Sequence, residues 1–114
     1  MLLALRFGDG SVGTIVYTAM GDARFPKEHI EVFGEGRVAA LDDFRTLQLV
    51  RDGSLKRRRS ANQDKGFREE IRRFLEAVRH GGPWPIPFEQ SVATTRATLA
   101  ALESLRSGAP QTLC

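Results

Sequence analysis

The sequence predicts an α+β fold in which an open antiparallel sheet of about six strands is followed by two helices packed on one face. Three observations support this class. Within residues 2–60, short β-favouring runs alternate with turn residues. After residue 64, hydrophobic residues recur at the spacing of a helix. The predicted strands therefore precede the predicted helices. The length of 114 residues fits a single domain spanning 1–114. Two helices cover only one face of such a sheet, so the other face or an edge is left to water or to a partner.

The first half of the chain is predicted to be a meander of strands. Residues 2–7 and 12–18 flank Gly8-Asp9-Gly10-Ser11, and Asp-Gly favours a hairpin because both residues tolerate positive φ. A loop of about ten residues then separates this hairpin from the rest. The later strands are expected at residues 29–33, 37–41, 46–51 and 54–60, with turns at Gly34-Glu35-Gly36 and Asp52-Gly53.

Two helices are predicted in the second half. Asp64 is a suitable N-cap for the first helix, and Gly81-Gly82-Pro83 ends it. Residues 84–87, WPIP, form a stiff extended connector because a residue before proline avoids helical angles. Residues 88–107 form the second helix, which Gly108 and Pro110 terminate. The first helix has one apolar stripe, formed by Phe67, Ile71, Phe74, Leu75 and Val78.

The composition is that of a soluble globular chain without a disulfide or metal framework. Hydrophobic residues make up 41% and charged residues 27%, and the longest apolar run falls far short of the roughly 20 residues of a membrane span. The opening MLLALRF is too short for a signal peptide, so we expect a cytoplasmic location and no membrane partner. Cys114 has no second cysteine to pair with. His29 and His80 lack partners at ligand or triad spacing, so neither a metal site nor a catalytic histidine is expected.

The stretch IEVFGEGRVA, residues 30–39, has two interpretations. It matches the G-x-G-x-x-A pattern of a dinucleotide-binding turn, which would need a helix directly after Gly36. However, that helix would span only about nine residues, residues 41–43 read as a strand that ends in a turn, and no further βαβ units follow. The sequence therefore favours a glycine-supported hairpin turn.

The net charge of +3 is concentrated in one basic run, Lys56-Arg57-Arg58-Arg59. Clustered cations can bind nucleic acid by releasing its counterions. Alternation along a strand would divide this run between two faces, and no aromatic residues are interleaved for base stacking. A solvated edge strand is the simpler interpretation, since charges protect a sheet edge from unwanted pairing.

The loop at residues 19–28, AMGDARFPKE, contains the best candidates for ligand binding. Arg24, Phe25 and Lys27 offer two cations and an aromatic ring, which suit an anionic or sugar-like ligand. The simpler alternative is a surface loop that packs Phe25 onto the sheet.

Four blocks of sequence resemble a known family: LRFGDGSVGTIVYTA, FPKEHIEVFGEGRVAALDDF, GFREEIRRFLEAVRHGG and SVATTRATLAALESLRSG. Together they resemble the C-terminal domain of the Gfo/Idh/MocA oxidoreductases, relatives of glucose-fructose oxidoreductase and inositol dehydrogenase. The resemblance covers essentially the whole chain. It implies an open antiparallel sheet that backs a substrate cleft and pairs with another subunit, so a homo-oligomer through the open sheet face is expected.

The resemblance also implies what this chain lacks. Family members bind NAD or NADP in an N-terminal Rossmann domain and act on sugars, cyclitols and their derivatives. Their catalytic Glu-Lys-Pro lysine and downstream histidine have no counterpart here, so no catalytic, cofactor-binding or metal-binding residue is assigned. We expect the accessory domain of a larger dehydrogenase, with no activity of its own. The alternatives are a stand-alone α+β interaction module and, third, a nucleic-acid binder acting through Lys56 to Arg59.

Overall fold

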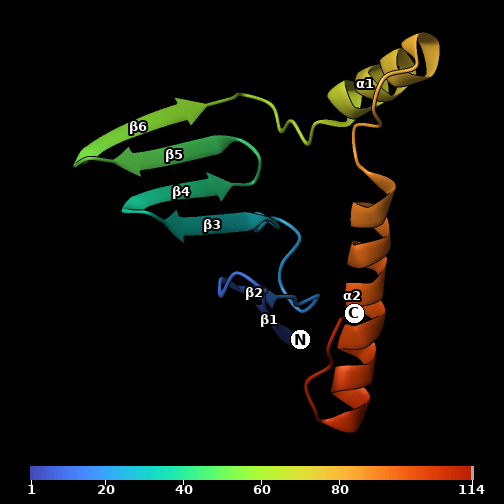
Figure 1. The fold of residues 1–114 in the computed structure, drawn as a ribbon. Helices are drawn as coiled ribbons and strands as arrows, with labels where there is room; N and C mark the ends of the chain where they lie inside the picture. The colour runs from blue at the N-terminus through green and yellow to red at the C-terminus, as the bar shows by residue number, and fades with distance from the viewer. Residues whose placement is uncertain (114) are drawn as a thin grey trace. The chain divides into compact units, whose positions relative to one another are not determined.

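The computed structural model describes residues 1–113 and contains six antiparallel strands followed by two helices, which confirms the α+β class (Figure 1). The strands form two sheets, one of two strands in the order β1-β2 and one of four in the order β3-β4-β5-β6. Every predicted strand and helix is present within a few residues of its expected bounds. These bounds are β1 Leu2–Arg6, β2 Val12–Val16, β3 His29–Gly34, β4 Arg37–Asp42, β5 Thr46–Arg51, β6 Ser54–Arg59, α1 Phe67–His80 and α2 Phe88–Ser107.

The chain divides into two compact units. The first unit, called the hairpin–helix unit, comprises Met1–Thr18 and the chain from Arg68 onward. The second, called the meander unit, is Ala19–Phe67 and is inserted into the first along the sequence. Each unit is described by itself.

In the meander unit, one two-residue turn connects β3 to β4 and another connects β5 to β6. Glu35 and Gly36 have φ values of 49° and 70°, and Asp52 and Gly53 have 52° and 70°. Positive φ at both central residues defines the type I′ turn, whose twist matches that of a hairpin. Residues 34–39 therefore form a strand end, a turn and the next strand, and no helix follows Gly36. The hairpin interpretation of G-x-G-x-x-A is confirmed.

A strained three-residue corner connects β4 to β5. Asp43 and Phe44 both have positive φ, 49° and 53°, and a bulky side chain rarely adopts this conformation. Surrounding groups hold the corner in place. The backbone N–H of Asp43 donates to the carbonyl of Glu28 at 2.7 Å, and the amide of Gln63 donates to the Asp43 carboxylate at 2.8 Å. The ammonium of Lys65 lies 5.7 Å from the centroid of the Phe44 ring.

The strand register assigns side chains of the meander to two faces. Ile30 lies opposite Leu41, and Leu41 lies opposite Leu47. Because side chains alternate along a strand, each of these residues shares its face of the sheet with the residue two positions away on the same strand. We call this the apolar face, and the opposite side the mixed face. Members of the apolar face are Ile30, Val32, Ala39, Leu41, Leu47 and Leu49, with Lys56 and Arg58 of β6 at its margin.

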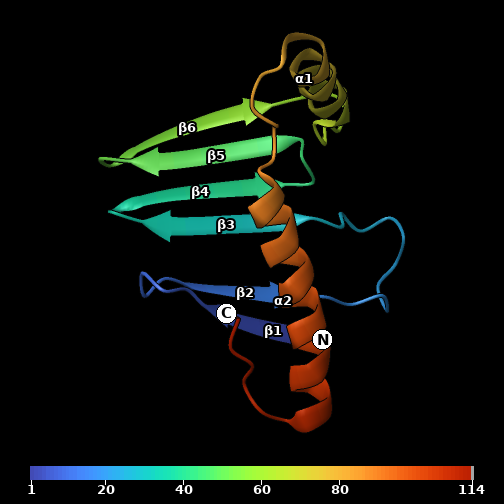
Figure 2. The same cartoon turned by 45° about the vertical axis from the view of Figure 1, so that its right-hand side comes forward.

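The hairpin–helix unit combines the β1–β2 hairpin with α2, which lie beside one another in both views (Figure 2). Ser11 closes the hairpin turn, because its backbone N–H and hydroxyl both donate to the Asp9 carboxylate, at 2.9 Å and 2.7 Å. These hydrogen bonds lower the pKa of Asp9, the hydroxyl making the largest contribution. The predicted hairpin is therefore present, but of Asp9 and Gly10 only Gly10 has positive φ, at 87°.

Helix α2 contributes a stripe of small residues to this unit. Ala97, Ala100, Ala101 and Ser104 are half-buried and line a groove together with β1. The more hydrophobic Leu99 lies on another side of the helix and is 62% exposed. The helix ends where the N–H of Gly108, at φ 66°, donates to the carbonyl of Ser104. Gly108 is therefore the predicted stop.

Helix α1 shows the predicted amphipathic pattern, yet its apolar stripe is solvent-accessible. The five stripe residues, from Phe67 to Val78, are between 43% and 66% exposed. Phe74 contacts the ring of Trp84, with centroids 5.4 Å apart. Asp64 accepts a hydrogen bond from the N–H of Gly66, so it orders the turn before the helix, which begins at Phe67.

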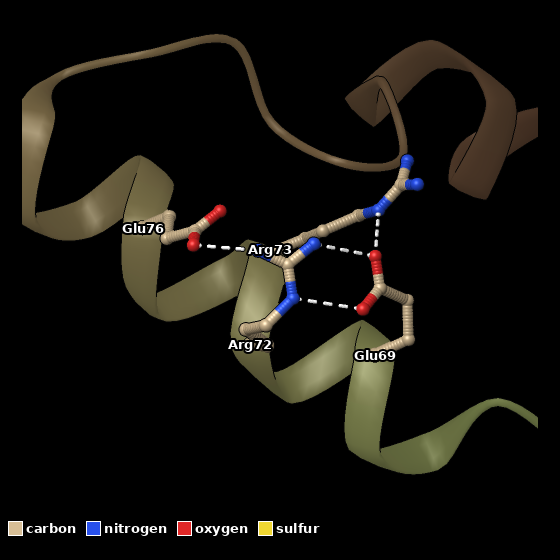
Figure 3. A network of polar contacts seen from close by, with 4 residues as sticks. All are labelled: Glu69, Arg72, Arg73 and Glu76. Carbon is tan, nitrogen blue, oxygen red and sulfur yellow. Dashed lines mark hydrogen bonds and ion pairs between the residues drawn. The ribbon is translucent and has the colours of Figure 1, made fainter.

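The polar side of α1 contains a network of four side chains (Figure 3). The Glu69 carboxylate accepts hydrogen bonds from Arg72 and from Arg73, and Arg72 also donates to Glu76 at 2.6 Å. Arg72 first, and then Arg73, lower the pKa of Glu69 to about 2. These side chains are about half exposed, so the network supports the helix locally.

No hydrophobic side chain among residues 1–113 is buried, and Thr46, at 8% exposure, is the one buried residue in this range. None of the helices in this described part of the chain has the length and apolar character needed to cross a membrane. In the meander unit, for example, Val32 and Leu55 are each 60% exposed.

Candidate functional site

The end of the meander sheet where β3 begins is the candidate functional site. Three segments of the meander unit meet there: the loop 19–28, the corner formed by Asp43, Phe44 and Arg45, and residues 60–65. The loop supplies the predicted ligand-binding residues, and the other two segments fix its C-terminal end.

Asp22 organises the predicted binding loop. Its carboxylate accepts the N–H of Arg24 at 2.8 Å, and its carbonyl accepts the N–H of Phe25 at 3.0 Å. Both interactions belong to a turn in which an aspartate side chain replaces a backbone acceptor. This turn directs the following residues toward solvent, and Phe25 is 76% exposed rather than packed on the sheet.

Two cations accompany Phe25 on this loop. Arg24 and Lys27 are exposed, and within residues 1–113 the side chain of neither forms an ion pair. Unpaired guanidinium and ammonium groups are available to carboxylate, phosphate or hydroxyl groups of a ligand. The loop thus has the chemistry predicted from its sequence, while ligand binding by Arg24, Phe25 and Lys27 stays a prediction.

An ion pair anchors the end of the loop. The Glu28 carboxylate binds the ammonium of Lys65, and both side chains are about one-third exposed. Lys65 also contacts the Phe44 ring, so the same ammonium joins the loop to the corner. The strained conformation of Phe44 is consequently maintained by groups from two other segments. This arrangement anchors the exposed loop at its C-terminal end.

His29, directly after the anchored Glu28, lies between two carboxylates. Its Nδ1 is 2.5 Å from Asp42, and its Nε2 is 3.3 Å from Glu31. The expectation that His29 has no partner is wrong, because the partners come from the strand register: His29 pairs with Asp42 across the hairpin. His29 and Asp42 lie equally far along the sequence from the Glu35-Gly36 turn, so a predicted hairpin with this turn places them opposite each other. Both ring nitrogens of His29 therefore have a carboxylate partner.

The carboxylates change the titration of His29. The hydrogen bond with Asp42, and next that with Glu31, raise its pKa above the ordinary value of 6.5. Both partners stabilise the protonated ring, so its contribution to folding is complete below pH 6.5 and is lost as the pH rises through the higher folded-state pKa. The sheet end is therefore most stable in mildly acidic solution.

We expect Asp42→Asn to lower the pKa of His29 toward its ordinary value, because the amide cannot stabilise the imidazolium as a carboxylate does. The His29 ring signals in an NMR titration measure this directly. Glu31→Gln serves as the matched variant and should lower the pKa less, since Glu31 is the second contributor. An unchanged titration in Asp42→Asn would mean that the short contact is absent in solution.

Within residues 1–113, no group of three or more histidine, cysteine or acidic side chains is arranged to hold a metal ion. The described residues therefore supply a loop with two cations and one aromatic ring beside a network of ion pairs. Comparison of the chain with protein-family models, with curated protein sequences and with solved structures finds no match.

Proposed function

We propose that this chain is the C-terminal domain of a larger NAD(P)-dependent oxidoreductase acting on sugars, cyclitols or their derivatives. In this role it backs the substrate cleft and mediates oligomerisation, and it is not catalytic alone. The observation that carries the proposal is the uncovered apolar face of the meander sheet. Val32, near the middle of β3, is 60% exposed, as expected of a domain whose partner covers it.

The accessible area supports the need for a partner. The chain exposes 10482 Å², whereas a compact monomer of 12.7 kDa exposes about 6,200 Å². Docking between two units of one chain typically covers about 600–1,500 Å², which is too little to account for the difference. An additional domain or subunit is the simplest source of the missing contacts.

The proposed division of labour assigns binding to this chain and chemistry to its partner domain. Arg24 and Lys27 would contact hydroxyl or anionic groups of the substrate, and Phe25 would pack on the apolar side of a sugar ring. NAD or NADP would be held by the Rossmann domain and would supply hydride transfer. His29 would stabilise the base of the loop, because its nitrogens already bind Asp42 and Glu31.

The reading frame upstream of this chain gives the most direct test. The proposal expects a strand followed by G-x-G-x-x-G and later a Glu-Lys-Pro tripeptide. In addition, calorimetry with NADH or NADPH should detect no binding to the 114-residue chain alone. Tight dinucleotide binding by this chain would contradict the proposal.

The exposed apolar surface equally favours a second candidate, a stand-alone α+β interaction module. That candidate expects translation to start at Met1 with no dehydrogenase domain upstream. The same reading frame therefore separates the two, and Arg24→Ala with Lys27→Ala provides an independent check. In the full-length enzyme this double variant should raise KM for the substrate and leave dinucleotide affinity unchanged.

A further inference from the structure

Strand β6 is an edge of the meander sheet and pairs only with β5 among the described strands. An edge strand presents backbone groups that can pair with another chain. All six residues of β6, Ser54–Arg59, are exposed. The second edge, β3, differs in charge because it contains Glu31 and follows Glu28.

The register shows which backbone groups of β6 are open. The N–H of Ser60 donates to the carbonyl of Arg45 at 2.8 Å, so position 60 faces β5. The Asp52-Gly53 turn leads to the same assignment. The residues that flank a two-residue turn form a hydrogen-bonded pair, so Ser54 and every second residue after it face β5. Residues 55, 57 and 59 therefore point their N–H and C=O groups away from β5. The open groups belong to Leu55, Arg57 and Arg59.

Four consecutive cations accompany these open groups. Within residues 1–113, Lys56, Arg57, Arg58 and Arg59 form no ion pair. Alternation places Arg57 and Arg59 on the mixed face and Lys56 and Arg58 on the apolar face. An incoming strand would thus meet positive charge on both of its faces. Like charges on two copies of β6 repel one another, which disfavours pairing of this edge with itself.

We propose that β6 is a docking edge for an extended acidic protein segment, which adds a fifth strand to the meander sheet. Carboxylates on both sides of that segment would pair with Lys56 to Arg59, and its backbone would bond to Leu55, Arg57 and Arg59. Leu55, which is 60% exposed, would pack against an apolar residue at one end of the segment. Charge complementarity selects the segment, and the open backbone groups orient it.

The same surface fits a nucleic acid less well. No aromatic side chain occurs in β6, so bases have no stacking platform there. The open N–H and C=O groups alternate along the strand, which matches the spacing of a protein backbone and not that of phosphates. The inference concerns the β6 edge and not the binding loop, so it is independent of the proposed enzyme function.

Fluorescence anisotropy on the full chain can test the docking edge. The probe is a labelled peptide of four consecutive glutamates followed by valine, with threonine at each end; its antiparallel register puts valine opposite Leu55. We expect saturable binding that Arg57→Glu with Arg59→Glu weakens at least about tenfold, because two attractive pairs become repulsive. Arg68→Glu with Arg79→Glu on α1 gives the same net charge and should retain binding.

Two N-methylated peptides then test the backbone pairing on the unaltered chain, so the result does not depend on how the variants fold. Methyl groups on the first and third glutamates and on valine face β6 and should abolish binding. Methyl groups on the second and fourth glutamates face away and should largely preserve it. Equal binding of the two peptides would overturn the proposal, because contact would then be electrostatic only. Tighter binding of a single-stranded oligonucleotide, lost in the same double variant, would also overturn it.

Discussion

In differential scanning calorimetry, the isolated chain is expected to unfold with at most about three-quarters of the roughly 80 kcal/mol typical of a 114-residue domain. A compact monomer of this mass removes about 12,000 Å² from water on folding. This chain, which exposes 10482 Å², removes only about 8,000 Å². Docking of its two units on one another would add at most about 1,500 Å². Because the enthalpy of unfolding scales with the area exposed, the deficit should appear in the calorimetric trace.

The experiment is informative only at concentrations where the chain sediments as a monomer, since self-association would restore buried area. A hydrophobic dye should bind the native chain and lose fluorescence once the proposed Rossmann domain is present in the same polypeptide. A full enthalpy in a sedimenting monomer, together with no dye binding, would show that the apolar face is already covered.

Val32→Lys should weaken association of the chain about 100-fold and leave the stability of the monomer within about 1 kcal/mol. Val32 is mostly exposed in the monomer, so lysine there meets water. In an interface through the apolar face, the substitution loses the burial of valine and places an ammonium among Ile30 and Leu41. That combination costs about 3 kcal/mol. Sedimentation velocity over a concentration series measures the change.

Glu31→Lys is the matched control, because it introduces the same side chain one residue earlier, on the mixed face. It breaks only the exposed contact with His29 and should associate nearly as the original chain does. If Glu31→Lys weakened association more than Val32→Lys, the mixed face would be the interface. If neither were affected, association would not use this sheet.

Local sequence signals predicted the turns and helices well, because each depends on neighbouring residues. Asp-Gly and Glu-Gly lie at the two type I′ turns, and Gly81 and Gly108 end the helices at positive φ. The corner at Asp43 and Phe44 had no such signal, because its positive φ values are imposed by contacts with distant segments. Tertiary contacts overrode local preference there.

Two features needed spatial information. The half-buried stripe of α2 consists of Ala97, Ala100, Ala101 and Ser104, whereas a hydrophobicity pattern selects leucines such as Leu99. These small side chains line the groove that α2 forms with β1. The strand register brings Asp42 to His29, and the distance between the two residues along the sequence gives no sign of this pairing.

The pattern of strands in the sequence also did not predict that the six strands form two separate sheets. Alternating runs specify how many strands form, while loop length decides which neighbours pair. Tight turns force β3, β4, β5 and β6 together, but the loop 19–28 imposes no pairing on β2 and β3. Six correctly placed strands therefore gave a sheet of two and a sheet of four.

The nested arrangement of the two units has a kinetic consequence. Every pairing in the meander joins consecutive strands across two or three residues, so its loops close at low entropic cost and it should fold early. The hairpin–helix unit must instead bring Met1–Thr18 to residues beyond Arg68, across about fifty intervening positions. On a ribosome the β1–β2 hairpin emerges before the meander yet waits for α2, which is made after the meander. During that interval the finished meander shortens the distance that the outer segments have to search.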